Sequence, residues 1–120
     1  MKNKLKEGHK GEDLVLKEYF KKGYKLLDRN VYFRGGEIDL ILKKDNLIVF
    51  VEVKKRKKGD FLSGIQSINK KKIDRIIKFS KIYLERKNLY EKVDVRFDVA
   101  IIEGENLNIL ENAFYEGFNL

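Results

Sequence analysis

Asp39, Glu52 and Lys54 are side chains whose types and spacing could support metal binding or acid–base catalysis. Asp39 lies in one predicted strand, and Glu52 and Lys54 lie in the next. If residues 45–46 form a two-residue turn, counting back along both strands places Asp39 directly opposite Glu52. Because side chains alternate along a strand, Lys54 then lies on the same face as both carboxylates.

The face that these carboxylates share is apolar elsewhere. Ile48 and Phe50 precede Glu52 on it. The opposite face is also apolar and carries Leu47, Val49, Val51 and Val53. A strand that is apolar on both faces is covered on both sides. Two facing carboxylates, with Cβ atoms ~5 Å apart, destabilise such a sheet unless a positive charge compensates them. We therefore expect Asp39→Ala to stabilise the metal-free fold.

Two sources of positive charge could compensate this carboxylate pair. Lys54 is one candidate. A divalent cation is the other, because hard cations bind carboxylate oxygens. The alternative is an ordinary ion pair between Glu52 and Lys54 at the solvated end of the strand, with Asp39 at its rim. The residues alone leave the metal site and the ion pair as open alternatives.

The elements that must position these residues follow from hydrophobic periodicity and from turn residues. The sequence predicts helices over 8–22 and 63–87, and strands over 24–33, 37–42, 47–53, 93–102 and 107–110. A basic loop over 55–60 leads into the second helix. The order α-β-β-β-α-β-β predicts a single α/β domain over residues 1–120, with helices flanking a mixed central β-sheet. The connection through the second helix should lead to a parallel strand.

Composition and charge restrict the class of protein. The chain has 120 residues, with 27 Lys and Arg against 19 Asp and Glu, and a formal net charge of +8. Every basic residue lies at or before Arg96, and the tail beyond it is acidic. Such a basic body favours a polyanionic partner, most simply nucleic acid. The alternative is a lysine-rich, solvated surface.

Other function classes are excluded by what the sequence lacks. There is no cysteine and one histidine, His9, so a thiol nucleophile, a disulfide and a Cys or His metal cluster are all excluded. No apolar run approaches the ~20 residues that span a bilayer. We therefore expect a cytoplasmic protein with no membrane association.

The two central strands resemble the core of a known nuclease superfamily. Residues 36–40 (Gly-Glu-Ile-Asp-Leu) followed by 51–54 (Val-Glu-Val-Lys) are similar to the Asp…Glu-x-Lys core of the restriction-endonuclease-like, or PD-(D/E)xK, nucleases. Over nearly its full length the chain resembles the YraN-like proteins, uncharacterised protein family 0102. The other matching segments are Gly11-Glu12, Gly23-Tyr24, Arg29-Asn30, Phe50, Arg56, Arg96-Phe97-Asp98-Val99 and Asn112-Ala113-Phe114. The chain departs from the superfamily's name motif because Ile38, not proline, precedes Asp39.

The resemblance implies a restriction-endonuclease-like domain, similar to archaeal Holliday-junction resolvases, and a metal-dependent, structure-selective DNA endonuclease. Asp39, Glu52 and the main-chain carbonyl of Val53 would bind Mg²⁺ or Mn²⁺. Glu12 would complete the metal site. Lys54 would orient or deprotonate a water molecule, or donate to a phosphate oxygen. The catalytic residues on this reading are Asp39, Glu52, Lys54 and Glu12. For Glu12 the alternative is an acid that the dipole of a helix N-terminus stabilises.

Basic residues close to the predicted site are candidate DNA contacts, since a phosphate backbone must arrive there. They are Arg34, Lys55, Arg56, Lys57 and Lys58. The alternative is an ordinary solvated loop. Tyr32 and Phe33 could stack on an exposed base, although core packing is expected for at least one of them. Glu37, opposite Lys54, is expected to pair with it, to support the site or to end the strand in water.

Two other functions compete with the nuclease. The first is a nucleic-acid-binding protein that keeps the fold and the basic surface but does not cut. The second is a partner-binding protein in which Asp39, Glu52 and Lys54 form a buried polar network. Resolution of branched DNA would favour a homodimer with two sites, because two strands must be cut.

Overall fold

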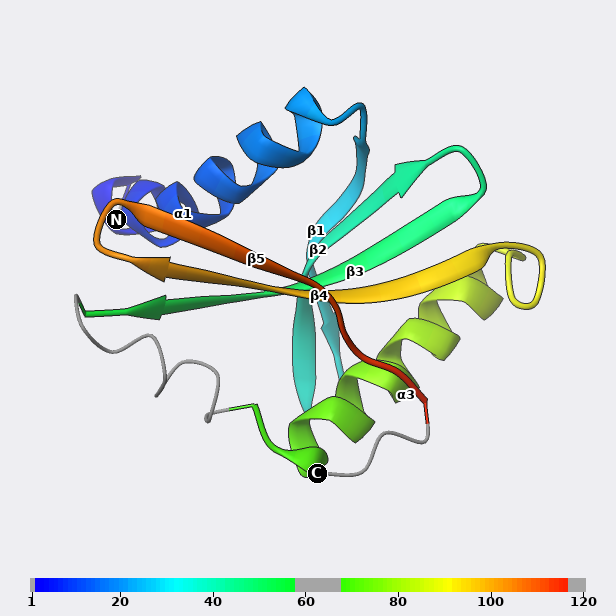
Figure 1. Ribbon diagram of the computed structural model, residues 1–120. Coiled ribbons are helices and arrows are strands. Elements are labelled where there is room, and N and C mark those ends of the chain that lie inside the picture. Colours follow the sequence, from blue (N-terminus) through cyan, green and yellow to red (C-terminus); the bar gives the residue numbers. More distant parts are fainter. Residues whose placement is uncertain (1, 58–67, 117–120) are drawn as a thin grey trace.

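A five-stranded sheet separates two helices in the computed structural model, which describes residues 2–57 and 68–116. In chain order the elements are α1 (Lys2–Lys21), β1 (Lys25–Phe33), β2 (Gly36–Lys44), β3 (Leu47–Arg56), α3 (Lys70–Arg86), β4 (Asp94–Glu103) and β5 (Asn106–Phe114). Figure 1 shows α1 on one side of the sheet and α3 on the other. The predicted order α-β-β-β-α-β-β is confirmed. Neither of these helices is long and apolar enough to cross a membrane.

The strands lie in the sheet in their chain order, β1-β2-β3-β4-β5. β3 and β4 are parallel, and their pairing runs from Leu47 beside Asp94 to Arg56 beside Glu103. The other neighbouring pairs are antiparallel. The predicted connection through the second helix to a parallel strand is therefore confirmed. In the β2–β3 hairpin Lys44 pairs with Leu47, which is the predicted register.

Among the described residues, α1 covers one face of the sheet and α3 the other, and each face forms its own hydrophobic core. On the α1 side, Val15 and Tyr19 pack with Val49 and Val51 of β3. On the α3 side, the core around the helix includes Ile48 and Phe50 of β3, with Ile76 and Tyr83 of α3. Alternate residues of β3 thus enter opposite cores, as expected for a strand that is apolar on both faces.

β3 continues further than the sequence indicated. Lys54, Lys55 and Arg56 were expected at the end of the strand and in a basic loop, but all three lie in β3 and pair with β4. The reason is that β4 extends to Glu103 and offers backbone partners that far. The basic residues therefore alternate between the two faces of the sheet.

The helix boundaries also differ from the prediction. α1 begins at Lys2 rather than at residue 8. α3 begins at Lys70, because the Asn69 side chain accepts a hydrogen bond from the Lys72 backbone N–H (2.9 Å) and caps the helix. Residues 68–69 are not helical, which corrects the predicted helix over 63–87. The start of that prediction, residues 63–67, lies outside the described residues.

β5 is longer than the predicted strand over 107–110. It pairs with β4 on both sides of an irregularity between Phe97 and Val99. Asn112, opposite this point, has a positive φ of 53°. The strand therefore resumes pairing after a bulge, which a search for regular alternation does not anticipate.

Candidate active site

Asp39 and Glu52 lie where β2 and β3 stop pairing. The last backbone pair of this hairpin is Leu40 with Val51, one position before the two carboxylates. Just beyond it, Asp39 Oδ2 accepts a hydrogen bond from the Val53 backbone N–H at 2.7 Å. The Asp39 side chain thus accepts the hydrogen bond of the Val53 backbone N–H, which lies beyond the last backbone pair of β2 and β3. The predicted proximity of Asp39 and Glu52 is confirmed, since both line one pocket of about 290 Å³.

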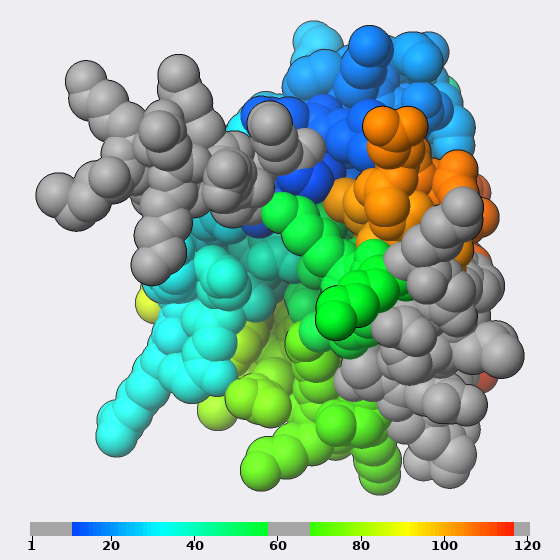
Figure 2. All heavy atoms as spheres, turned by 90° about the vertical axis from the view of Figure 1, so that its left-hand side faces the viewer, coloured from blue at the N-terminus to red at the C-terminus, as the bar shows by residue number. Residues whose placement is uncertain are grey.

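The pocket lies between the β1–β2 turn, the end of β3 and the start of α3. Its walls are Gly35, Gly36, Glu37, Asp39, Glu52, Lys72, Arg75, Ile76 and Phe79. Figure 2 looks onto this end of the molecule, where the cyan residues of β1 and β2 lie near the green end of β3 and the yellow-green start of α3. A ligand in this pocket would meet three carboxylates of the hairpin, Glu37, Asp39 and Glu52, and two cations of the helix.

Burial raises the pKa of the Asp39 carboxyl to about 7. The negative charge of Glu52 acts in the same direction, and the charges of Glu12 and Glu37 add smaller effects. The hydrogen bond from the Val53 N–H opposes the shift, because it stabilises the ionised form. The folded protein therefore disfavours the ionised form of Asp39, and a cation next to this carboxylate would favour that form.

Two lysines contact the same oxygen of Glu52. Lys54 Nζ lies 3.3 Å from Glu52 Oε1, and Lys72 Nζ lies 2.9 Å from it. Burial lowers the pKa of Lys54, and the adjacent Lys72 amine lowers it further, while Glu52 opposes both effects. Lys54 is consequently the lysine of the pair that gives up a proton more readily.

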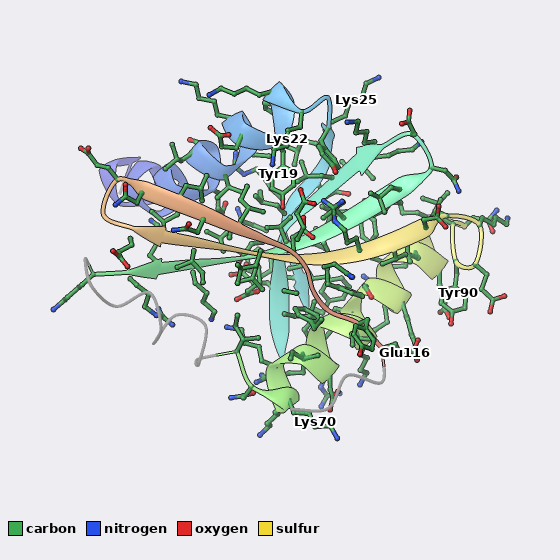
Figure 3. All side chains as sticks on the ribbon, viewed as in Figure 1. Tyr19, Lys22, Lys25, Lys70, Tyr90 and Glu116 are labelled. Carbon is green, nitrogen blue, oxygen red and sulfur yellow. The ribbon has the colours of Figure 1, made fainter. Side chains whose placement is uncertain are left out.

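Lys72 is a site residue that sequence reasoning missed. It belongs to a run of three lysines, residues 70–72, and nothing in the run distinguishes its members. Lys70 and Lys71 are exposed, whereas Lys72 is partly buried and lines the pocket. Figure 3 shows Lys70 at the outer edge of the molecule. The Asn69 cap, which sets where α3 begins, is the signal that could have singled out Lys72.

Glu12 lies in α1 and is buried, and its charge reaches Asp39. Its Oε1 accepts hydrogen bonds from the Arg29 guanidinium (3.1 Å) and the Asn30 amide (3.0 Å). Arg29 also binds Asp13 at 3.0 Å. Glu12 is thus held by β1 near the site, and its predicted role as a metal ligand stays a prediction.

Glu37 is a second residue whose position the structure clarifies. It lines the pocket, and its Oε2 is buried with no hydrogen-bond partner among the described residues. The ion pair of Lys54 is with Glu52 rather than with Glu37. The expected pairing of Glu37 with Lys54 is therefore wrong, and Glu37 adds a further carboxylate to the wall of the site.

The predicted DNA contacts do not all lie on one face. Arg34 is exposed in the β1–β2 turn, and Lys57 is exposed just after β3. Lys55 lies against Gly11 of α1, where a Cβ on Gly11 would come within 2.5 Å of its Cε. Arg56 is partly buried and donates to the Lys55 carbonyl oxygen at 2.7 Å. Lys58 lies outside the described residues.

Two basic residues of α3, Lys72 and Arg75, line the pocket although neither was among the predicted DNA contacts. Arg75 lines the pocket one turn after Lys72, and its guanidinium donates to the Gly35 carbonyl oxygen at 3.2 Å. This bond ties α3 to the β1–β2 turn. The cations that line the pocket among the described residues, Lys72 and Arg75, therefore both belong to α3.

The neighbouring aromatic residues Tyr32 and Phe33 have separate positions. Phe33 stacks on Phe79 of α3, with ring centroids 4.7 Å apart. Tyr32 is 75% exposed. Core packing of one of the two, as expected, is confirmed, and only Tyr32 has a ring open to solvent.

Asp98, in the segment 96–99 that carries part of the family resemblance, is a fully buried carboxylate away from the pocket walls. It accepts hydrogen bonds from the Tyr19 hydroxyl (2.6 Å), from the Arg96 guanidinium (2.9 Å) and from the Asn112 backbone N–H (3.0 Å). Figure 3 shows Tyr19 between α1 and the sheet. Asp98 therefore joins α1, β4 and the bulge of β5, and its role is structural.

The carboxylate oxygens at the pocket are suitable ligands for a hard cation that retains part of its hydration shell. Among the described residues, no group of three or more Asp, Glu, His or Cys side chains is arranged to enclose a metal ion. Mg²⁺ commonly binds through one or two carboxylates, with water and substrate phosphate completing its octahedron. Asp39 and Glu52, which both line the pocket, meet that requirement, and burial together with the charge of Glu52 raises the pKa of Asp39.

The fold and the site define an α/β protein with a carboxylate–lysine cluster at the open end of its central hairpin. The chain belongs to the uncharacterised protein family UPF0102, whose model matches residues 11–102. This confirms the membership that the sequence indicated.

Curated relatives match the chain over nearly its whole length. A UPF0102 protein of Sulfurihydrogenibium sp. (strain YO3AOP1) is 46% identical over 112 residues, which are 93% of this chain and 96% of the relative. A UPF0102 protein of Vibrio parahaemolyticus is 36% identical over 117 residues, 96% and 97% of the two chains. One of Dictyoglomus turgidum is 39% identical over 118 residues, 93% and 99% of the two chains.

Proposed function

We propose that this protein is a Mg²⁺- or Mn²⁺-dependent endonuclease that hydrolyses phosphodiester bonds in DNA and selects its substrate by structure. The observation that carries the proposal is the convergence of Asp39 and Glu52 on one pocket, with Lys54 against Glu52. This is the Asp…Glu-x-Lys arrangement of the nucleases that the sequence resembles. The described residues form one α/β unit and contain no separate sequence-reading module, which favours selection by shape.

Each of these side chains has a part in the proposed hydrolysis. Asp39 and Glu52 would hold the metal ion, with the Val53 carbonyl. The ion, when bound, supplies electrostatic stabilisation of the transferring phosphoryl group and lowers the pKa of water. Lys54 accepts the proton of the attacking water, for which its lowered pKa suits it. A bond forms from the water oxygen to phosphorus, the bond from phosphorus to the sugar oxygen breaks, and solvent protonates the leaving oxygen.

Glu12 would complete the site from α1. The hydrogen bonds from Arg29 and Asn30 hold its carboxylate near the hairpin. Arg34 and Lys57, both exposed, would contact phosphates of the backbone on either side of the scissile bond. Resolution of branched DNA would favour a homodimer with two sites, because two strands must be cut. Because DNA is the proposed substrate, the expected place of action is the cytoplasm.

A cleavage panel tests this proposal. Labelled single strand, duplex, flap, fork and four-way junction are each incubated with Mg²⁺, Mn²⁺ or EDTA. Wild type is compared with Asp39→Asn and with Asp94→Asn, which changes an exposed carboxylate at the far end of the β3–β4 pair. We expect metal-dependent cutting by wild type and Asp94→Asn, and none by Asp39→Asn.

The other outcomes each favour a different function. Cutting that survives in Asp39→Asn would come from a contaminant or from another site. Tight, salt-sensitive binding without cutting would support the alternative, a nucleic-acid-binding protein on the same fold. If the protein neither cuts nor binds DNA, the carboxylate pair is a polar network within the fold.

A further inference from the structure

Lys72 is placed so that it can reach both Glu52 and the solvent-facing part of the pocket. Its backbone N–H donates to the Asn69 side chain, which caps α3 and places Lys72 in the first turn of the helix. Its Nζ contacts Glu52 Oε1 at 2.9 Å, yet its side chain is 30% exposed. Lys54, the other lysine on Glu52, is 14% exposed and lies within a strand. Lys72 is therefore the lysine with more freedom to move.

Two ammonium groups contact the Glu52 carboxylate, one more than its single negative charge neutralises. The amines of Lys54 and Lys72 both contact a single oxygen, Glu52 Oε1, at 3.3 and 2.9 Å. A divalent cation on Glu52 would repel both lysines. The pocket that Lys72 lines is the space through which a phosphate would approach Asp39 and Glu52. A lysine displaced from Glu52 would meet an anion there.

We propose, building on the function proposed above, that Lys72 is a phosphate-binding residue that exchanges partners: it pairs with Glu52 in the free protein and with a non-bridging oxygen of the substrate phosphate in the complex. Metal binding and phosphate binding are thereby linked, because the metal ion releases the lysine that the phosphate uses. Arg75, in the same wall, stays bonded to the Gly35 carbonyl and keeps α3 next to the β1–β2 turn.

The first test measures metal affinity without DNA, using Mn²⁺ alone and calorimetric titration. Lys72→Ala should bind Mn²⁺ at least about fivefold more tightly than wild type, because the competing ammonium is gone. The matched control is Lys71→Ala, which removes the same charge from the same helical turn but at an exposed position. It should change Mn²⁺ affinity less than about twofold, because salt screens exposed charges.

The second test measures binding of a short fluorescein-labelled duplex in Ca²⁺ at several salt concentrations. Lys72→Ala should bind the duplex more weakly, and the slope of log K against log salt should fall by about 0.9, the value of one phosphate contact. Lys72→Arg keeps the charge and should keep the wild-type slope. Circular dichroism and melting of each variant establish that it is folded, and Lys72→Gln serves as a second neutral variant.

The two measurements separate this inference from the proposed function. Suppose that wild type binds Mn²⁺ and cuts DNA, but Lys72→Ala and Lys71→Ala bind Mn²⁺ with equal affinity. That result overturns the inference alone and leaves the proposed function standing. An unchanged salt slope in Lys72→Ala also overturns it. Wild type that neither binds Mn²⁺ nor cuts overturns the proposed function and this inference together.

Discussion

The Asp39 carboxylate accepts a hydrogen bond from the backbone N–H of Val53 across the hairpin, at 2.7 Å. This bond lies just beyond the last backbone pair of β2 and β3. It holds Asp39 in the pocket that Glu52 also lines, although the two negative charges repel each other. Holding the two carboxylates together therefore lowers the folding stability of the hairpin. Such an arrangement of perturbed titratable groups is typical of functional sites.

Asp39→Asn should stabilise the metal-free protein, and more so at high pH. The pKa of Asp39 rises from 3.8 to about 7 on folding, so the folded protein binds this proton more tightly and wild-type stability falls as the pH rises between those values. An asparagine carries no charge, and its amide oxygen can still accept from Val53. We expect a gain of about 2–4 kcal/mol at about pH 8 and under about 1 kcal/mol at about pH 4.

Urea unfolding at a series of pH values measures this difference. Asp94→Asn is the control, because it removes an exposed carboxylate and should leave the pH dependence of wild type unchanged. A gain that is the same at every pH, or a loss of stability above pH 7, would contradict the assignment of the raised pKa to Asp39.

Mg²⁺ or Mn²⁺ should raise the Tm of the wild-type protein at about pH 8 and leave that of Asp39→Asn nearly unchanged. The ion binds the folded pocket and not the unfolded chain, so at about 100 times its Kd it adds about 2.7 kcal/mol. The gain should shrink below about pH 7, where a proton occupies Asp39. Differential scanning calorimetry with EDTA reversal measures it. Equal shifts in both proteins would place the metal elsewhere.

Arg34→Ala and Lys57→Ala should each weaken duplex binding and reduce its salt dependence. Both side chains are exposed: Arg34 precedes Gly35 of the pocket wall, and Lys57 follows β3, the strand that carries Glu52. Loss of one phosphate contact lowers the slope of log K against log salt by about 0.9. Lys25→Ala is the matched control, since Lys25 is exposed at the far end of β1 and lies across the molecule from Lys70 in Figure 3. Identical slopes for all four proteins would place the binding surface elsewhere.

Asp98→Asn should destabilise the protein without changing its affinity for Mn²⁺. The substitution weakens the bonds to Tyr19 and Arg96 and leaves the partly buried Arg96 guanidinium with a neutral partner at this position. Such a loss costs about 2–4 kcal/mol. Chemical unfolding and Mn²⁺ titration of the same sample test both parts. A stable variant with lost Mn²⁺ binding would assign Asp98 to the functional site after all.

The central hairpin was predictable because its information is local. A two-residue turn at 45–46 and strict alternation along β3 are enough to bring Asp39 beside Glu52 and to place Lys54 on the same face. A register error of one residue would have moved every apolar side chain of β3 to the wrong core. The hydrophobic pattern therefore determined the register, and with it the pair of carboxylates.

The surroundings of the hairpin depend on residues that are distant in the chain. β3 extends through Arg56 because β4, nearly fifty positions later, supplies backbone partners. Glu12 is held by Arg29 and Asn30, which propensity and periodicity in α1 do not reveal. Asp98 lies in a recognisable segment, but its partners on α1 and β5 show that it stabilises the fold.

The sequence by itself determined the order of the elements, the hairpin register and the three residues at the centre of the site, because these depend on turn chemistry and on the period of apolar side chains. Only the tertiary structure decided which lysine of residues 70–72 reaches Glu52, and that Lys55 lies on the α1 side of the sheet. The physical reason is that these positions depend on where a helix is capped and where a strand stops pairing. Both are set by hydrogen bonds that a linear pattern of hydrophobicity and charge does not encode.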